Sequence, residues 1–226
     1  MCFSAAASFV GGAVLTSIGI LSIRKNNQPS QRLFAAVPFV FGIQQIAEGF
    51  VWTALQSSGQ QLMLTLATYV FLFTALVVWS TVLPLSILLM EKDQTRRRIL
   101  RVFLAVGIVA SLYHLVAMFL VSVSAQISSF HIKYLVATPD ELMIAASLAY
   151  LIATILPIFT SSNKKMIYFG IIILVSYLVA FIFYLEYLTS VWCFFAALAS
   201  VVILRIVSSP VQEETQLESE QNVLGI

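Results

Sequence analysis

Seven long apolar blocks alternate with short polar segments along the chain. Each block contains roughly 20 residues or more, which is the length that a helix needs to cross the hydrocarbon core of a bilayer. The strands of a membrane barrel would instead carry a polar residue at every second position, and the blocks lack this alternation. The pattern predicts transmembrane helices at residues 3–23, 33–55, 62–90, 99–123, 139–159, 166–185 and 188–207.

The composition agrees with a protein embedded in a bilayer. Of the 226 residues, 60% are hydrophobic and only 10% are charged, whereas soluble domains carry about 25% charged residues. We therefore predict an all-α, polytopic membrane protein with one seven-helix domain at residues 1–209. Residues 210–226 are polar and acidic, which favours a disordered cytoplasmic tail. The net charge of +2 comes from basic residues in loops, so it gives no indication of nucleic-acid binding.

The basic residues predict the orientation, because cytoplasmic loops carry an excess of Lys and Arg. Every Lys and Arg except Lys133 falls in the first, third or fifth loop or near the end of the last helix. We therefore expect the N-terminus outside and the C-terminus in the cytoplasm. The fourth loop, on the outer side, holds Lys133 and His131, and we expect the His131 side chain to be solvated.

The stretch FGIQQIAEGFVW at residues 41–52 places two amides and a carboxylate inside an apolar block. At 100° per residue, Gln44, Gln45, Glu48 and Trp52 share one face of the helix, which must turn toward other helices. A charged side chain facing lipid would cost at least ~2.5 kcal/mol. Glu48 is then a metal ligand, a proton-transfer group or a ligand counter-ion, or else a structural carboxyl that ties helices together.

Other chemically active side chains are predicted at a similar depth. At 1.5 Å per residue, Glu48 lies about 10 Å, His114 about 13 Å and Cys193 about 7 Å below the outer ends of their helices. Trp192 adjoins Cys193, and Tyr184 ends the sixth helix on the same side. The polar groups therefore concentrate in the outer half of the predicted bundle.

The two cysteines leave three interpretations open. Cys2, at the outer mouth of the first helix, could form a disulfide with Cys193, because the outer compartment is oxidising. Both thiols could instead bind a metal together with Glu48 and His114, since thiolate, imidazole and carboxylate are common metal ligands. In the third interpretation both cysteines are unpaired, and Cys193 simply packs.

Three stretches carry a resemblance to a known family: MCFSAAASF at the start, FGIQQIAEGFVW, and SVWCFFAALAS near the end of the apolar region. They resemble a family of uncharacterised bacterial integral membrane proteins that begin Met-Cys-Phe-Ser. The resemblance implies seven helices in a bacterial cytoplasmic (inner) membrane. It implies no activity and no cofactor.

An outward-facing site inside the membrane is the leading functional hypothesis. It would bind a small ligand, a lipid or a metal, with haem as a further option, and the sequence leaves open whether it is catalytic. The predicted ligand-binding residues are Gln44, Gln45, Glu48, Trp52, His114, Trp192 and Tyr184. The predicted metal ligands are Cys2, Glu48, His114 and Cys193. The alternatives are a transporter or proton-coupled carrier, and a sensor or assembly protein without chemistry.

Overall fold

The computed structural model describes residues 4–208, apart from the side chains of Asp140 and Ala196. Within these residues, seven helical segments are long and apolar enough to cross a membrane. They are Ala5–Lys25, Pro29–Gln56, Gln61–Met90, Gln94–Leu120, Glu141–Thr160, Lys164–Phe183 and Leu185–Ser208. The prediction of an all-α polytopic fold is confirmed. Cys2 and the predicted tail at 210–226 lie outside the described residues.

Local breaks divide some of the seven segments into shorter elements. The elements are α1 (Ala5–Lys25), η1 (Pro29–Gln31), α2 (Arg32–Ala35), α3 (Val37–Gln56), α4 (Gln61–Leu72), η2 (Phe73–Val78), α5 (Trp79–Met90), α6 (Gln94–Leu120), β1 (Val123–Ser128), β2 (His131–Val136), α7 (Asp140–Thr160), α8 (Lys164–Phe183), η3 (Leu185–Tyr187) and α9 (Leu188–Ser208). The second segment breaks at Ala36, because Pro38 at the start of α3 has no N–H to continue the ladder. The third is continuous but contains a π-helical turn, η2, a form that is frequent at functional sites.

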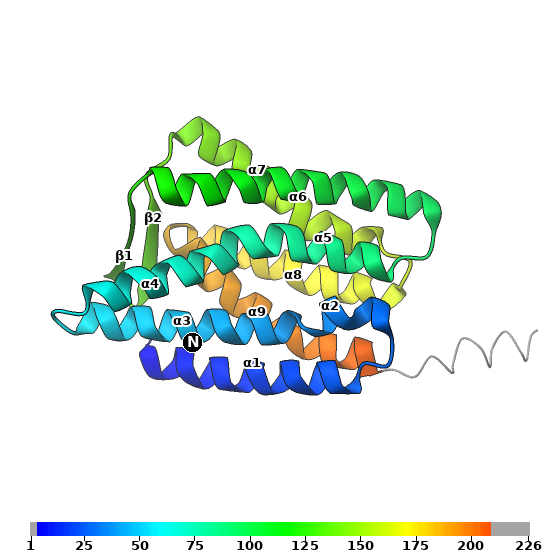
Figure 1. Cartoon of the computed structure of the whole chain (residues 1–226), viewed down its shortest axis with the longest axis horizontal. Coiled ribbons are helices and arrows are strands. Elements are labelled where there is room, and N and C mark those ends of the chain that lie inside the picture. Colours follow the sequence, from blue (N-terminus) through cyan, green and yellow to red (C-terminus); the bar gives the residue numbers. More distant parts are fainter. Residues whose placement is uncertain (1–3, 209–226) are drawn as a thin grey trace, which may run out of the picture.

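The helices lie side by side and run alternately in opposite directions (Figure 1). Helix α1 packs along α3, and α9 contacts α1, α3 and α8. The α1–α3 contact depends on glycine, because a methyl group at Gly42 would lie 3.0 Å from the carbonyl oxygen of Gly12. This close approach is the role that small residues commonly play between membrane helices.

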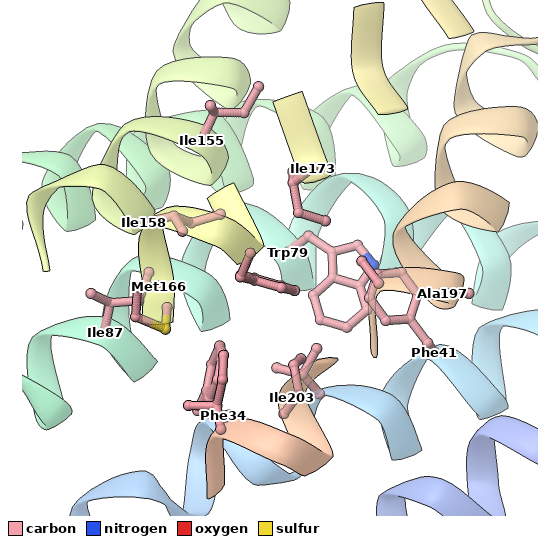
Figure 2. Close-up of a cluster of buried hydrophobic side chains, with 14 of the residues drawn as sticks. Phe34, Phe41, Trp79, Ile87, Ile155, Ile158, Met166, Ile173, Ala197 and Ile203 are labelled. Atoms are coloured by element: carbon pink, nitrogen blue, oxygen red, sulfur yellow. The ribbon is translucent and has the colours of Figure 1, made fainter. Parts of the chain in front are cut away.

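One end of the bundle carries the basic residues of the helix ends and connections, and we call it the basic end. Its interior is a dense apolar core (Figure 2) in which α2, α3, α5, α7, α8 and α9 all take part. Phe34, Ile87, Met166 and Ile203 are completely buried there, and the Phe34 and Phe169 rings meet edge to face at 5.7 Å. The basic end is therefore closed by packed side chains.

The opposite end carries an antiparallel hairpin, β1–β2, and we call it the hairpin end (Figure 1). The strands meet at a tight turn where Ser129 is left-handed, with φ 56°. Strand β1 contacts α3 and α4, and β2 contacts α9 and η3. The prediction that His131 is solvated is wrong, since it is only 8% exposed. Its ring stacks on Tyr187 with the centroids 4.8 Å apart.

Candidate functional site

The polar face of α3 is buried inside the bundle. Gln44, Gln45 and Glu48 are completely buried and Trp52 is 3% exposed, whereas Phe50 on the other side of the helix is 44% exposed. The helical periodicity of the sequence therefore predicted correctly which side of α3 turns inward. It turns inward because lipid offers no hydrogen-bond partner for an amide or a carboxylate.

Hydrogen bonds connect this face to two other helices. The indole Nε1 of Trp79 on α5 donates to Gln44 Oε1 at 2.7 Å. The Ser190 hydroxyl on α9 donates to Glu48 Oε1 at 2.5 Å. Gln45 Nε2 donates to the other oxygen, Glu48 Oε2, at a longer 3.4 Å. We call these five residues the amide–acid cluster.

Two atoms of the amide–acid cluster have no hydrogen-bond partner within residues 4–208. They are Gln44 Nε2, a donor, and Gln45 Oε1, an acceptor. The Gln44 amide faces the thiol of Cys193, which is only a weak acceptor. Most buried side-chain polar atoms in proteins are paired, and this cluster is one of several places in the described residues where such atoms lack a partner.

A cavity of about 620 Å³ opens beside the cluster, between α7, α8, α9 and strand β2. Apolar side chains such as Met143, Leu148 and Phe181 form most of its wall. Ser190 is completely buried but is among the residues that line it, and its hydroxyl donates to Glu48. Glu48 is therefore one hydrogen bond behind the wall of this cavity.

A smaller chamber of about 100 Å³ lies deeper in the bundle. Its wall includes His114, Tyr150, Tyr177, Trp192 and Cys193. The two spaces adjoin, since they have five wall residues in common. These are Ser147, Leu151, Tyr177, Leu188 and Thr189. The larger cavity thus leads to an aromatic inner chamber close to the amide–acid cluster.

The comparisons with known proteins identify the family but give no activity. A family model described as a family of unknown function, DUF6629, matches residues 1–217. The chain belongs to this family. No curated protein and no solved structure matches the chain. The DUF6629 assignment agrees with the predicted resemblance to an uncharacterised family, while the bacterial source and inner membrane remain predictions.

Several predicted ligand-binding residues of this DUF6629 member come together. Gln44, Gln45 and Glu48 form the amide–acid cluster, and Trp192 and His114 line the inner chamber. His114 is anchored in its own helix, where its Nδ1 lies 2.8 Å from the Ala110 carbonyl oxygen. These five residues therefore belong to two adjoining parts of one region.

Trp52 and Tyr184 lie apart from the cavities, against the hairpin. Trp52 packs with Ile132 of strand β2. Tyr184 lies next to His131, with the ring centroids 5.2 Å apart. The sequence placed both residues at the correct end of the bundle, but it could not show that a hairpin covers them.

The predicted metal site gains no support from the described part of the chain. No group of three or more His, Cys, Asp or Glu side chains gathers there in a way that could hold a metal ion. Cys193 is a free, buried thiol. Cys2 lies outside the described residues, so its disulfide and metal-ligand roles stay predictions.

Ser190, Trp79 and Tyr150 were not predicted as site residues, yet they shape this region. Ser190 lies one helical turn before Cys193, on the same face of α9, and this spacing was the available signal. The Tyr150 hydroxyl donates to the Ala75 carbonyl oxygen at 2.8 Å, in the π-helical turn. Nothing in the local sequence of Trp79 or Tyr150 distinguishes them from packing aromatics.

Proposed function

We propose that this protein binds an amphipathic small molecule of the lipid class, which it takes up from the bilayer. The observation that carries the proposal is the cavity of about 620 Å³. Its wall is mainly apolar but includes hydroxyl side chains, and one of these, that of Ser190, donates to the buried Glu48 carboxyl. Binding sites for small molecules are typically apolar cavities with few polar groups, and these groups fix the orientation of the ligand.

The wall of the cavity supports entry from the side. Met143, Ile144 and Leu148 on α7 are 45%, 59% and 55% exposed, and Phe181 on α8 is 46% exposed. In a membrane these surfaces face acyl chains, so an alkyl chain moves between bilayer and cavity without contact with water. The ligand tail therefore occupies the space between α7 and α8.

The amide–acid cluster supports a polar group at the inner end of the ligand. Ser190 lines the cavity and its hydroxyl donates to Glu48, while Gln44 and Gln45 of the same cluster hold one spare donor and one spare acceptor. With the predicted orientation, the hairpin end faces outward, and the ligand comes from the outer leaflet. The packed core at the basic end supports binding over transport, because the space that continues from the chamber into this core, beside Phe41, Trp79 and Phe169, is only about 30 Å³.

The proposal is tested by a substitution that fills part of the cavity and by a measurement of the small molecules that remain bound. Full-length protein is purified in dodecyl maltoside, and its bound small molecules are identified by mass spectrometry after solvent extraction. The Ser147→Phe variant places a ring between the cavity and the inner chamber, because Ser147 lines both. Ala145→Phe is the matched control, since Ala145 is exposed on the same helix and lines neither space.

We expect the wild type and Ala145→Phe to retain about one amphipathic molecule per chain, and Ser147→Phe to lose it. The same three proteins are then titrated with dodecanol and with dodecyltrimethylammonium. If the wild type retains no amphipathic molecule and binds neither probe, the proposed function is wrong.

A further inference from the structure

We propose that the ligand headgroup is a cation, a protonated amine or a quaternary ammonium, which sits in the inner chamber against Tyr150, Tyr177 and Trp192. This inference rests on the proposed function, because the alkyl tail of the same ligand would occupy the larger cavity. It adds the chemical class of the headgroup.

The aromatic rings of the inner chamber are set at steep angles to one another. Trp192 meets Tyr150 with ring centroids 5.6 Å apart and planes at 78°, and Tyr177 with centroids 5.2 Å apart and planes at 74°. His114 meets Tyr150 at 6.2 Å and 84°. The rings that line the chamber are therefore oriented in several directions. The negative faces of aromatic rings attract cations, and Trp and Tyr are strong partners.

The charges around the two spaces have the sign that a cation requires. No Lys or Arg occurs among the residues that line the cavity or the chamber. The acid Glu48 lies behind Ser190, close enough to the Cys193 thiol of the chamber wall for an electrostatic interaction. Glu186, at the cavity wall, is paired with Lys133 at 3.0 Å, so Glu48, one hydrogen bond behind Ser190, is the nearby acid without an ion pair among the described residues.

The size and chemistry of the chamber argue against other headgroups. A phosphate or carboxylate would lie beside a buried acid, without a Lys or Arg in the chamber wall to offset its charge. A sugar would leave most of its hydroxyl groups unpaired, because few polar side chains line the chamber: Ser147, Thr189, Tyr177, His114 and the Trp192 indole N–H. A volume of about 100 Å³ suits a compact ammonium group.

The test compares three amphiphiles with the same tail: dodecyltrimethylammonium, dodecanol and dodecanoate. Their affinities for the full-length protein in dodecyl maltoside are measured by native mass spectrometry. We expect the wild type to bind the ammonium about tenfold more tightly than the alcohol, as a desolvated cation–π site with a nearby acid would, and dodecanoate most weakly. This comparison needs no variant, so a misfolded mutant cannot obscure it.

Two variants then test whether the preference for the ammonium over the alcohol depends on the inner chamber and on Glu48. We expect Glu48→Gln and Trp192→Leu each to lower the ammonium-to-alcohol preference about threefold or more, with little change in dodecanol affinity. Trp52→Phe is the matched control, because Trp52 is also a buried tryptophan but lines neither space, and this variant should keep the preference. Equal wild-type affinities for the ammonium and the alcohol would overturn the headgroup inference and leave the proposed function standing. Failure to bind any of the three would remove both.

Discussion

Glu91 at the basic end and Glu48 near the hairpin end are both buried carboxylates, yet their surroundings differ. Glu91 accepts hydrogen bonds from the backbone N–H groups of Lys92, Asp93 and Ser162 and from the Ser162 hydroxyl, at 2.7–3.0 Å. Glu48 accepts one short bond from Ser190 and one long bond from Gln45. The first carboxylate is well supplied with donors, and the second is poorly supplied.

The comparison separates a structural carboxylate from a candidate binding group. Glu91 ties the α5–α6 connection to the α7–α8 connection, and Arg97 strengthens the same corner by donating to the Leu88 and Glu91 carbonyl oxygens. Around Glu48, polar atoms of Gln44 and Gln45 stay unpartnered among the described residues, and Ser190, which donates to Glu48, lines a cavity. Buried polar groups with spare capacity are where a ligand gains most.

The largest expected effect is the difference in stability between the two glutamate-to-glutamine variants. Glu91→Gln should lower the free energy of unfolding by roughly 2 kcal/mol. The NH₂ group of the new amide would replace a carboxylate oxygen that now accepts hydrogen bonds, and it cannot accept from the same donors. Glu48→Gln should lower the free energy of unfolding by less than about 1 kcal/mol, because Ser190 can still donate to an amide oxygen. Thermal unfolding of both variants in detergent measures the difference. Equal losses would contradict the distinction between the two ends.

We expect low pH to destabilise the basic end of the bundle, because Glu91 becomes protonated. Burial raises the pKa of Glu91, but the donors from Asp93, Ser162 and Lys92 outweigh it and hold the pKa below its usual value. Since the folded pKa is the lower one, this stabilisation is complete above about pH 5 and is lost as the pH falls through the folded pKa. The thermal midpoint of the wild type should therefore fall more steeply below about pH 5 than that of Glu91→Gln. Parallel curves would show that Glu91 does not contribute.

A smaller effect is expected at the hairpin. His131→Ala removes the stacking on Tyr187, so it should weaken the attachment of the hairpin by about 1 kcal/mol. Hydrogen exchange at β1 and β2 should become about fivefold faster, with little change in α5 or α9. The control is Leu135→Ala in the same strand, where the side chain is 40% exposed. Faster exchange throughout the bundle would mean that the hairpin is not a separate unit.

The smallest effect is expected for the ion pair beside the hairpin. Lys133 Nζ lies 3.0 Å from Glu186 Oε2, but the Glu186 side chain is 65% exposed. Pairs of this kind contribute about 0–1 kcal/mol, so Lys133→Ala should change the thermal midpoint very little. A large fall in the thermal midpoint of this variant would contradict the prediction. It would mean that Lys133 makes an important stabilising contact at the hairpin end.

Hydropathy along the chain was sufficient to place the seven helices, because the bilayer sets the length of each one independently. The same reasoning predicted the inward face of α3, since a helix rotates its polar side chains away from lipid whichever neighbours it has. The hairpin was not predicted, because the polar segment between α6 and α7 was interpreted as a solvated loop. Its period-2 alternation on both sides of Ser129 and Phe130 was the available signal.

By itself, then, the sequence determined which residues cross the membrane and which side of α3 carries the buried acid. Only the tertiary structure decided what that acid meets. Ser190 is 142 residues away in the chain, and Trp79 is 35 residues from Gln44. It also decided that α7, α8 and α9 enclose a cavity. The physical reason is that helices in lipid choose partners by close packing and hydrogen bonds, which depend on how every helix is rotated at once, whereas hydropathy acts on each helix alone.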